Sequence, residues 1–547
     1  MKTTSFAPRR LWILLWHFLI LIAALVSVAS GKPSTADHTQ FEILQQDFQS
    51  GPEVTEACLS CHTEAARQVH RSIHWTWEYA HPETGQLLGK KNVINAFCGN
   101  IQSNEPRCTS CHVGYGWEDD SFDFSAENRV DCLVCHDRTG EYFKIPAGAG
   151  HPAYEPNTPS SGKIYQPKDL GNIARQVGMP GRENCGACHF YGGGGDGVKH
   201  GDLDSSLVSP DHGLDVHMAV DGANMACQDC HRGSGHQWAG SRYHTTAKDE
   251  IGTGKPGERR EAASCESCHG HTPHDHNSSG LIQATTLDNH VDKVACQTCH
   301  IPEFARGGVA TKTLWDWSVA GQRNEHGQPI KGHYDKNGQI VPGKNEHGHY
   351  TYLSIKGRFE YGEDVTPAYR WFQGDVVYKL LGETIDPSHR VYLNEISGSY
   401  QDDDARIWPF KIMQGRQAYD EVNNILVRSH VFGPNDGTSY WENLDWEKAL
   451  AAGMSTTDVP FSGQHGFIDT AMYWPITHMV APAADAVGCV ECHTKDGRLA
   501  GLDGFYLPGR DKNQAVDRAG FFLLLVAILG VAGHGLLRLL THRRRHH

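Results

Sequence analysis

Two long apolar runs stand near the two ends of the chain. The first covers residues 11–28, follows Lys2, Arg9 and Arg10, and leads into small residues at 28–30. A basic start, an apolar stretch and a small-residue site are typical of an export signal. We therefore interpret residues 1–30 as a signal peptide. The run is also long enough for an uncleaved membrane anchor, which is the alternative.

The second apolar run covers residues 519–537 and is followed by Arg538 and by three arginines at 543–545. Its length approaches the ~20 residues that a helix needs to cross a bilayer. Positive residues after a span favour a cytoplasmic tail. We predict a linker at 511–518, a transmembrane helix at 519–540 and a cytoplasmic basic tail at 541–547, with the globular part on the periplasmic face of the inner membrane. The alternative is a buried C-terminal helix.

The chain between these runs is rich in turns. Gly- and Pro-rich stretches such as 148–162 and 192–197 predict loops, and residues 31–300 contain no evident long strand. Residues 301–488 are rich in aromatic side chains, and 332–341 and 349–359 alternate like β-hairpins. We expect a mainly α fold with extensive irregular structure and an insert at 301–488 of mixed α/β that contains β-hairpins. The insert would cover cofactors, shape a substrate channel or form a contact in a homo-oligomer.

Composition changes this picture, because only 39% of the 547 residues are hydrophobic although Gly, Pro and His number 59, 25 and 35. Something other than side chains must fill the interior. Of the 17 cysteines, 16 fall into eight CxxCH motifs, and only Cys98 is left over. The motifs, in chain order, are Cys58, Cys61 and His62; Cys108, Cys111 and His112; Cys132, Cys135 and His136; Cys185, Cys188 and His189; Cys227, Cys230 and His231; Cys265, Cys268 and His269; Cys296, Cys299 and His300; and Cys489, Cys492 and His493.

The CxxCH spacing suits c-type haem, because two thiols three positions apart form thioethers with the vinyl groups of one haem and the adjacent histidine reaches its iron. Zinc knuckles or disulfides would not require a histidine after every CxxC. The sequence therefore predicts eight c-type haems, seven attached to residues 31–300 and the eighth to 489–510. The fold would be that of a multihaem cytochrome c organised around packed haems. Haem is attached outside the cytoplasm, in agreement with an export signal.

The net charge argues against one class of partner. The formal charge is -15, and haem propionates would add further negative charge. Nucleic acid is therefore not an expected partner.

Each haem iron also needs a second ligand or an open site. Two strong ligands give an iron suited to electron transfer, whereas an open or weakly held position admits substrate. The histidines that we favour as second ligands lie mostly on polar segments near a motif: His74, His151, His200, His217, His244, His290 and His478. The alternative for each is a surface or propionate-contacting histidine. Further competitors are His70, one helical turn from His74, and the cluster His271, His274 and His276.

The flanks of the motifs are more specific than the motifs themselves. Four segments carry a resemblance: ACLSCHTEAARQVHRSIHWTWEY at 57–79, FCGNIQSNEPRCTSCHVGYGW at 97–117, NCGACHFYGGGGDGVKHGDLD at 184–204, and residues 294–317. They resemble the octahaem tetrathionate reductase family of cytochromes c. That family is related to pentahaem cytochrome c nitrite reductase and to octahaem hydroxylamine oxidoreductase.

The resemblance implies that the second haem is the catalytic one and has a lysine on its distal face. Lys199, in the segment GDGVKHGD, matches that lysine, with Asp196 nearby and Cys98 matching an active-site cysteine. A neutral amine is a weaker and more easily displaced ligand than imidazole, in agreement with an iron that can open. The alternatives are a solvated or propionate-pairing lysine for Lys199, an inert buried thiol for Cys98 and a turn residue for Asp196.

The function that we expect is a reductase that takes electrons from a quinol-linked or cytochrome donor and passes them through bis-histidine haems to the second haem. The resemblance names tetrathionate as the substrate, and nitrite and hydroxylamine suit the same iron. Two alternatives remain. One is an electron-transfer conduit without a substrate, and the other is oxidation in the manner of hydroxylamine oxidoreductase.

Overall fold

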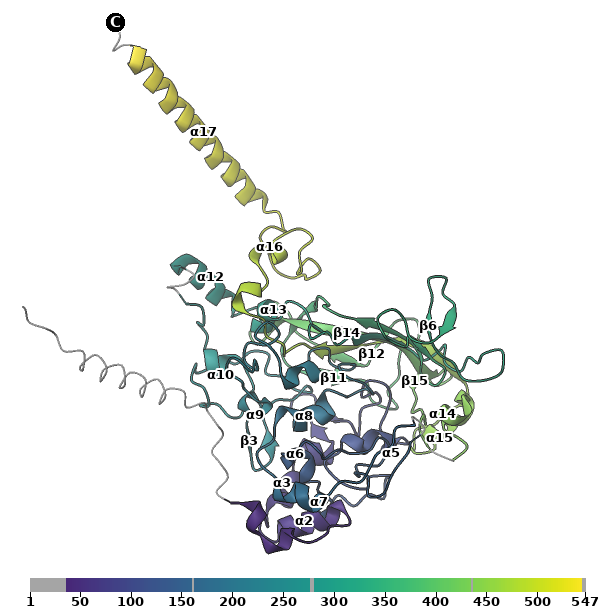
Figure 1. Cartoon of the computed structure of the whole chain (residues 1–547). Helices are drawn as coiled ribbons and strands as arrows, with labels where there is room; N and C mark the ends of the chain where they lie inside the picture. Colours follow the sequence, from purple (N-terminus) through teal and green to yellow (C-terminus); the bar gives the residue numbers. More distant parts are fainter. Residues whose placement is uncertain (1–35, 160–161, 276–279, 434–435, 544–547) are drawn as a thin grey trace, which may run out of the picture.

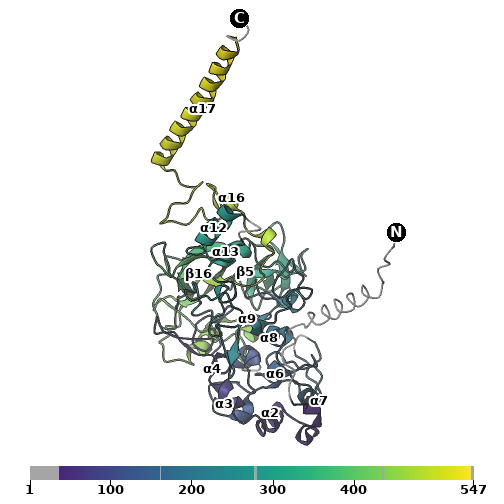
Figure 2. The same ribbon diagram turned by 90° about the vertical axis from the view of Figure 1, so that its left-hand side faces the viewer.

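A computed structural model describes residues 36–159, 162–275, 280–433 and 436–543 of the chain. Its body carries short helices at one end and a β-sheet towards the other, and the C-terminal helix α17 (Gln514–Arg543) projects away from it (Figures 1 and 2). The expected signal peptide, residues 1–30, lies outside the described residues.

The helices of the body are short, and each CxxCH motif lies in or beside one of them. One helical turn brings residues three positions apart onto the same face, as two thiols on one haem require. The helices that carry motifs are α2 (Gly51–Leu59), α5 (Glu105–Cys108), α6 (Leu133–His136), α8 (Arg182–His189), α9 (Cys227–Cys230), α10 (Glu266–His269), α13 (Cys296–His300) and α16 (Cys489–Cys492). The remaining helices are α3 (Ala65–His70), α4 (Ile73–Thr76), α7 (Leu170–Arg175), α12 (Leu281–His290), α14 (Tyr440–Asn443) and α15 (Trp446–Met454).

A ten-stranded mixed sheet forms the core of the insert. Its strands follow the order β12-β16-β14-β5-β9-β8-β6-β7, and β10 and β15 also pair with β14. The strands are β5 (Thr311–Asp316), β6 (Lys331–Tyr334), β7 (Ile340–Pro342), β8 (Tyr352–Leu353), β9 (Gly357–Gly362), β10 (Ala368–Phe372), β12 (Val391–Tyr392), β14 (Arg406–Asp420), β15 (Ile425–Leu426) and β16 (His465–Pro475). The two longest, β14 and β16, pair antiparallel from Phe410↔Pro475 to Asp420↔His465.

Three two-stranded sheets complete the fold. They are β1 (Tyr79–Ala80) with β2 (Leu87–Leu88), β3 (Gly233–Ser234) with β4 (Gln237–Trp238), and β11 (Val376–Tyr378) with β13 (Asn394–Ile396).

The sheet corrects the expected fold class. The chain is 26% helix and 17% strand, so it is not mainly α. The hairpins expected at 332–341 and 349–359 are present as β6–β7 and β8–β9. The expectation missed β14, the 15-residue strand that joins them to the rest. Its first six residues are all buried, so they lack the polar-apolar alternation of a half-exposed strand, and Pro409 interrupts the pattern further.

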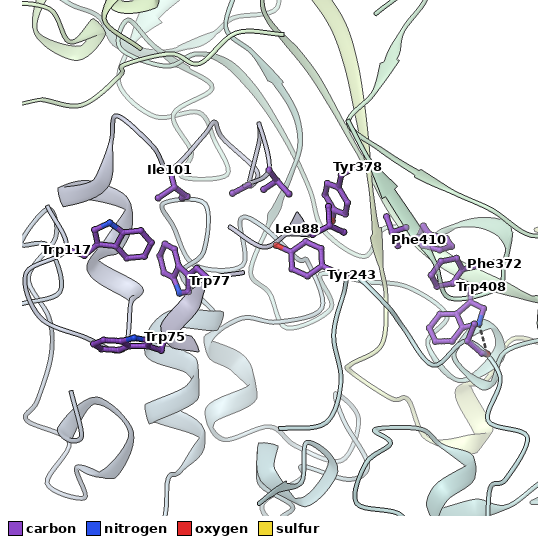
Figure 3. Packing of buried hydrophobic residues seen from close by; sticks show 14 of the residues in the cluster. Trp75, Trp77, Leu88, Ile101, Trp117, Tyr243, Phe372, Tyr378, Trp408 and Phe410 are labelled. Atoms are coloured by element: carbon purple, nitrogen blue, oxygen red, sulfur yellow. Dashed lines mark hydrogen bonds between the residues drawn. The ribbon is translucent and has the colours of Figure 1, made fainter. Parts of the chain in front are cut away.

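An aromatic cluster joins the helical end to the sheet. Figure 3 shows Trp75, Trp77 and Trp117 at one end of this cluster and Phe372 and Phe410 at the other. Partly buried Cys108 and Cys111 of the second motif pack against the same cluster. The second motif is therefore held by a side-chain core that reaches the insert.

The C-terminal helix has the properties of a membrane span by length and composition. Within α17, Gln514–Thr541 has a mean hydropathy of 2.2 and no buried residues. This exposure contradicts the alternative of a buried C-terminal helix. The segment before α17 is fixed to the body, because Leu499, Leu502 and Leu507 pack against residues of β10 and β14.

Candidate haem-binding sites and active site

Seven of the eight motif histidines face a second histidine across a gap. The ring centroids of these pairs lie 5.9–6.5 Å apart. The pairs, in motif order, are His62–His38, His136–His236, His189–His74, His231–His478, His269–His217, His300–His274 and His493–His290.

This gap fits one iron. A metal-bound imidazole nitrogen lies about 2 Å from the metal, and with about 1 Å more to its ring centre, two rings on opposite sides of one metal have centres about 6 Å apart. Several rings are also held by their other nitrogen. The Nδ1 atoms of His136 and His231 donate to the carbonyls of Gly178 and Ala239 at 2.8 and 3.0 Å. Such bonds orient Nε2 as a ligand, so the residues present fit c-type haem.

The same pattern extends to histidines opposite the motifs. His274 Nδ1 lies 2.7 Å from Asp288 Oδ1, and His478 Nδ1 lies 3.1 Å from Asp202 Oδ2. The carboxylates fix the tautomer that leaves Nε2 free for a metal.

Four of the seven favoured second ligands lie in these pairs: His74, His217, His290 and His478. The competitor His274 forms a fifth pair. Sequence reasoning missed His38 and His236. His38 begins a short 3₁₀ turn 20 residues before Cys58, and His236 occupies the turn of the β3–β4 hairpin, five residues after His231. A histidine on a tight turn near a motif was the sequence signal that could have identified both residues as second ligands.

Three favoured histidines have other neighbours. His151 Nδ1 lies 3.0 Å from Tyr154 Oη, and the His200 ring packs edge-on against Trp474. His244 Nδ1 lies 3.0 Å from Asp375 Oδ1. None of the three has a motif histidine opposite it among the described residues.

Of the other competitors, His70 stacks on Trp75 with ring centroids 4.4 Å apart, and His276 is outside the described residues.

The second motif differs from the other seven. His112 is fully buried, and within the described residues its ring faces aromatic side chains and no second histidine. The rings of Trp75 and Trp117 lie 5.1 and 4.9 Å from it. Burial lowers the pKa of His112 to about 3, so the ring is neutral. Its Nε2 lies 2.7 Å from the carbonyl of Trp75, and its Nδ1 has no partner.

Lys199 is buried near the second motif at only 6% exposure. Its Nζ lies 5.0 Å from the centre of the Trp474 ring and has no hydrogen-bond partner within the described part of the chain. Burial lowers the pKa of Lys199 well below its usual value, and Arg242 adds to this effect. The thiols of Cys98 and Cys111 oppose this shift in the pKa of Lys199. A neutral amine in this position has the protonation state that metal binding requires.

Lys411 of β14 fixes the backbone of the Lys199 loop. Its Nζ donates to the carbonyls of Val198 and Lys199 at 3.1 and 2.8 Å and to Thr311 Oγ1 at 2.6 Å. Lys411 has no exposed surface, and it is the cross-strand partner of Trp474. The sheet that the sequence did not predict therefore positions Lys199.

Cys98 and Asp196 have different surroundings. Cys98 is partly buried and, like the other 16 cysteines, forms no disulfide. It lines a small pocket together with Asn95, Asn100 and Trp317. Asp196 accepts hydrogen bonds from the backbone and hydroxyl of Ser205, and its place in an active site stays a prediction.

Thiols of different motifs interact with one another in four pairs: Cys58–Cys132, Cys111–Cys188, Cys185–Cys227 and Cys265–Cys296. The backbone of Val487 donates to Cys299 at 2.9 Å and joins the seventh motif to the eighth. The second motif thus adjoins the fourth, and the eighth lies where α17 leaves the body (Figure 1).

Two motif thiols, Cys61 and Cys268, accept a hydrogen bond from a serine. Neither belongs to the four thiol pairs. Instead, the hydroxyl of the preceding serine donates to each sulfur, from Ser60 to Cys61 at 3.8 Å and from Ser267 to Cys268 at 3.9 Å. Cys61 is also exposed, whereas Cys268 is partly buried. Haem attachment at these two thiols therefore stays a prediction, supported by the CxxCH pattern and by the opposed histidine pairs of the first and sixth motifs.

The motifs, the opposed histidine pairs and the short helices around them define a multihaem cytochrome c. Comparison with known proteins makes this more specific. The crystal structure of octahaem cytochrome c from Shewanella oneidensis superposes with a TM-score of 0.71 at 38% sequence identity, covering 86% of this chain and 98% of that one. The chain therefore belongs to the octahaem cytochromes c, and the expected family resemblance is confirmed.

Two further matches are narrower. Residues 312–496 match the family described as bacterial cytochrome c. A protein of Archaeoglobus fulgidus described as uncharacterized is 23% identical over 283 residues, which cover 43% of this chain and 93% of that protein.

Proposed function

We propose that this octahaem cytochrome c is a reductase on the periplasmic face of the inner membrane, with its active site at the second motif. It would carry eight haems and reduce a small sulfur or nitrogen compound, with tetrathionate, nitrite and hydroxylamine as candidates. The observation that carries the proposal is the contrast at His112. Seven motif histidines face another histidine, whereas His112 faces none within the described residues, and the buried, unpaired amine of Lys199 is our candidate for its distal ligand.

The residues have separate roles in this proposal. Haem iron would supply electrons and a site where a substrate atom can bind. Lys199, as a neutral amine, would be the ligand opposite His112, and an amine is displaced more easily than imidazole. The opposed histidines would hold the other irons closed, and Cys98, which lines a small pocket, would lie on the substrate side.

The electron donor would act at the opposite end of the motif series. The eighth motif is 21 residues before α17, and α12, which carries His290, lies beside α16 at the base of that helix (Figures 1 and 2). A membrane-anchored α17 would hold this motif near a quinol-linked or cytochrome donor. Electrons would then pass from the eighth motif towards the fourth and the second.

Substitution of Lys199 tests the proposal. Lys199→Leu should keep eight haems by pyridine haemochrome assay, convert a single iron to a high-spin signal in electron paramagnetic resonance spectra, and change the rate of substrate reduction. Lys199→His should restore the low-spin signal and slow turnover, because imidazole is harder to displace. The control Lys163→Leu changes an exposed lysine and should leave both readouts unchanged. Unchanged spectra in Lys199→Leu would contradict the proposal.

A pure electron conduit is the second candidate, supported by the seven opposed histidine pairs. Such a protein would exchange electrons with redox dyes but reduce none of the three candidate substrates. Turnover assays with each compound separate the two functions.

A further inference from the structure

A buried arginine lies where the sixth and seventh motifs meet. Arg406, the first residue of β14, is 2% exposed, and its Nη1 forms an ion pair with Glu266 Oε1. Glu266 stands between the two cysteines of the sixth motif. The carbonyl of the next residue, Ile407, accepts a hydrogen bond of 2.7 Å from Thr298 Oγ1, and Thr298 stands between the two cysteines of the seventh motif. Hydrogen bonds therefore tie the start of β14 to both motifs.

The ion pair occupies only one nitrogen of the Arg406 guanidinium group. Nε and Nη2 are buried and have no hydrogen-bond partner in the part of the chain that the structure describes. These two nitrogens share one edge of the planar group, and two parallel N–H bonds on such an edge match the two oxygens of a carboxylate. Arginine keeps its charge in proteins, and a buried donor without an acceptor is unfavourable. The free edge is therefore suited to a second carboxylate.

Acidic side chains of the chain do not occupy this edge. Glu266 is the one side chain that pairs with Arg406 within the described ranges. Asp292, just before the segment that hydrogen-bonds to Ile407, pairs with Lys248 at 2.9 Å and leaves 62% of its side chain exposed. Haems attached to the sixth and seventh motifs would bring carboxylates of another kind, their propionates, into this region.

We propose that Nε and Nη2 of Arg406 bind a haem propionate at the junction of the sixth and seventh motifs and raise the reduction potential of that haem. Reduction adds negative charge to the haem, and a fixed cation at its propionate favours that step. Glu266, on the remaining nitrogen, holds the guanidinium in place. The contact requires haem at these motifs and applies equally to a reductase and to an electron conduit.

Reduced-minus-oxidised infrared spectra of the haem-loaded full chain, prepared with isotope-labelled propionates, test this contact. Loss of Arg406 alone would leave Glu266 buried and unpaired, so Arg406→Met is combined with Glu266→Gln and compared with Glu266→Gln alone. One labelled carboxylate band should shift. Potentiometric titration should lower the midpoint potential of one haem by about 59 mV, which is about a tenfold change in the equilibrium constant of a one-electron couple.

The control is Arg416→Met, because Arg416 also lies on β14 but has 48% of its side chain exposed and pairs with Asp469 at 3.7 Å. It should leave the labelled bands and the potentials unchanged. Arg406→Lys keeps the charge but replaces the two-nitrogen edge by one ammonium group. This variant should keep all its haems, shift the same labelled band and change the potential by less than about threefold in the equilibrium constant.

Two outcomes would overturn the inference. If no labelled band shifts in the combined variant or in Arg406→Lys, Arg406 serves Glu266 alone and binds no propionate. If the band shifts but every midpoint potential stays the same in the combined variant, the contact does not raise the potential of the haem. A combined variant that fails to fold leaves the decision to Arg406→Lys, whose unchanged bands would contradict a two-nitrogen contact.

Discussion

The seven sites with opposed histidines and the second site differ in how firmly they hold a ligand. At the paired sites a ring stands on each side of the gap, and bonds such as those from His136 and His274 fix the rings through Nδ1. At the second site the motif histidine is enclosed by tryptophan rings, and the nearby group is the flexible amine of Lys199. Under the proposed function, the chain would therefore confine an exchangeable ligand to one motif.

Removing a histidine from a paired site should abolish this difference at that site. His236→Ala takes away the ring opposite His136, so one low-spin signal should be lost completely and a high-spin signal should appear, while the haem count stays at eight. Electron paramagnetic resonance spectra of the oxidised protein measure this change. His347→Ala, which alters an exposed histidine of the insert, serves as the control. Full retention of the low-spin signals would show that His236 is not the second ligand at the third motif.

Lys411 is the positioning residue on which the second site depends most. Lys411→Met removes three hydrogen bonds from a charged donor, two of them to the Lys199 loop, and bonds of this kind are worth about 1.5–3 kcal/mol each. We expect turnover to fall at least about tenfold, together with an altered ligand signature of the second haem, and Lys411→Arg to recover part of both. If the spectra of Lys411→Met match those of the unmodified protein, Lys411 contributes to stability and does not position Lys199. Lys336→Met, at an exposed lysine, is the control.

The sequence predicts the covalent chemistry of this protein better than its architecture. CxxCH is a local pattern, so all eight motifs could be read directly. Which histidine lies opposite a motif histidine is determined by tertiary structure. The sequence analysis missed His236 and His38 for that reason. The sheet that supports Lys199 was missed because β14 is buried on both faces at its start, where alternation gives no signal. The role of Lys411, which lies on this sheet, could not be identified without it.

Cys98→Ser tests whether the second site differs from the other seven in its contact with substrate. Because Cys98 lines a small pocket and belongs to no CxxCH motif, the variant should keep eight haems and all seven low-spin pairs. Turnover should change by a few-fold, because a hydroxyl is smaller and less polarisable than a thiol. Steady-state kinetics with each candidate substrate measure the change. Loss of haem, or unchanged kinetics on every substrate, would exclude Cys98 from the active site.

The smallest expected effect concerns Glu105, a buried carboxyl three residues before Cys108. Burial raises the pKa of Glu105 to about 7 from an ordinary value of 4.5. The folded protein thus holds this proton more tightly than the unfolded chain, so the stabilising effect is complete below pH 4.5 and disappears as the pH rises through 7. The loss amounts to about 3 kcal/mol. Glu105→Gln cannot ionise, so its thermal midpoint should rise relative to that of the unmodified protein between pH 4.5 and 7.

Differential scanning calorimetry across this pH range measures the effect. Glu118→Gln changes an exposed carboxyl in the same region and should give a difference that does not vary with pH. A similarly flat difference for Glu105→Gln would show that the carboxyl is solvated in the folded protein. The second motif would then have no buried acid beside it. In that respect its surroundings would not differ from those of the seven sites with opposed histidines.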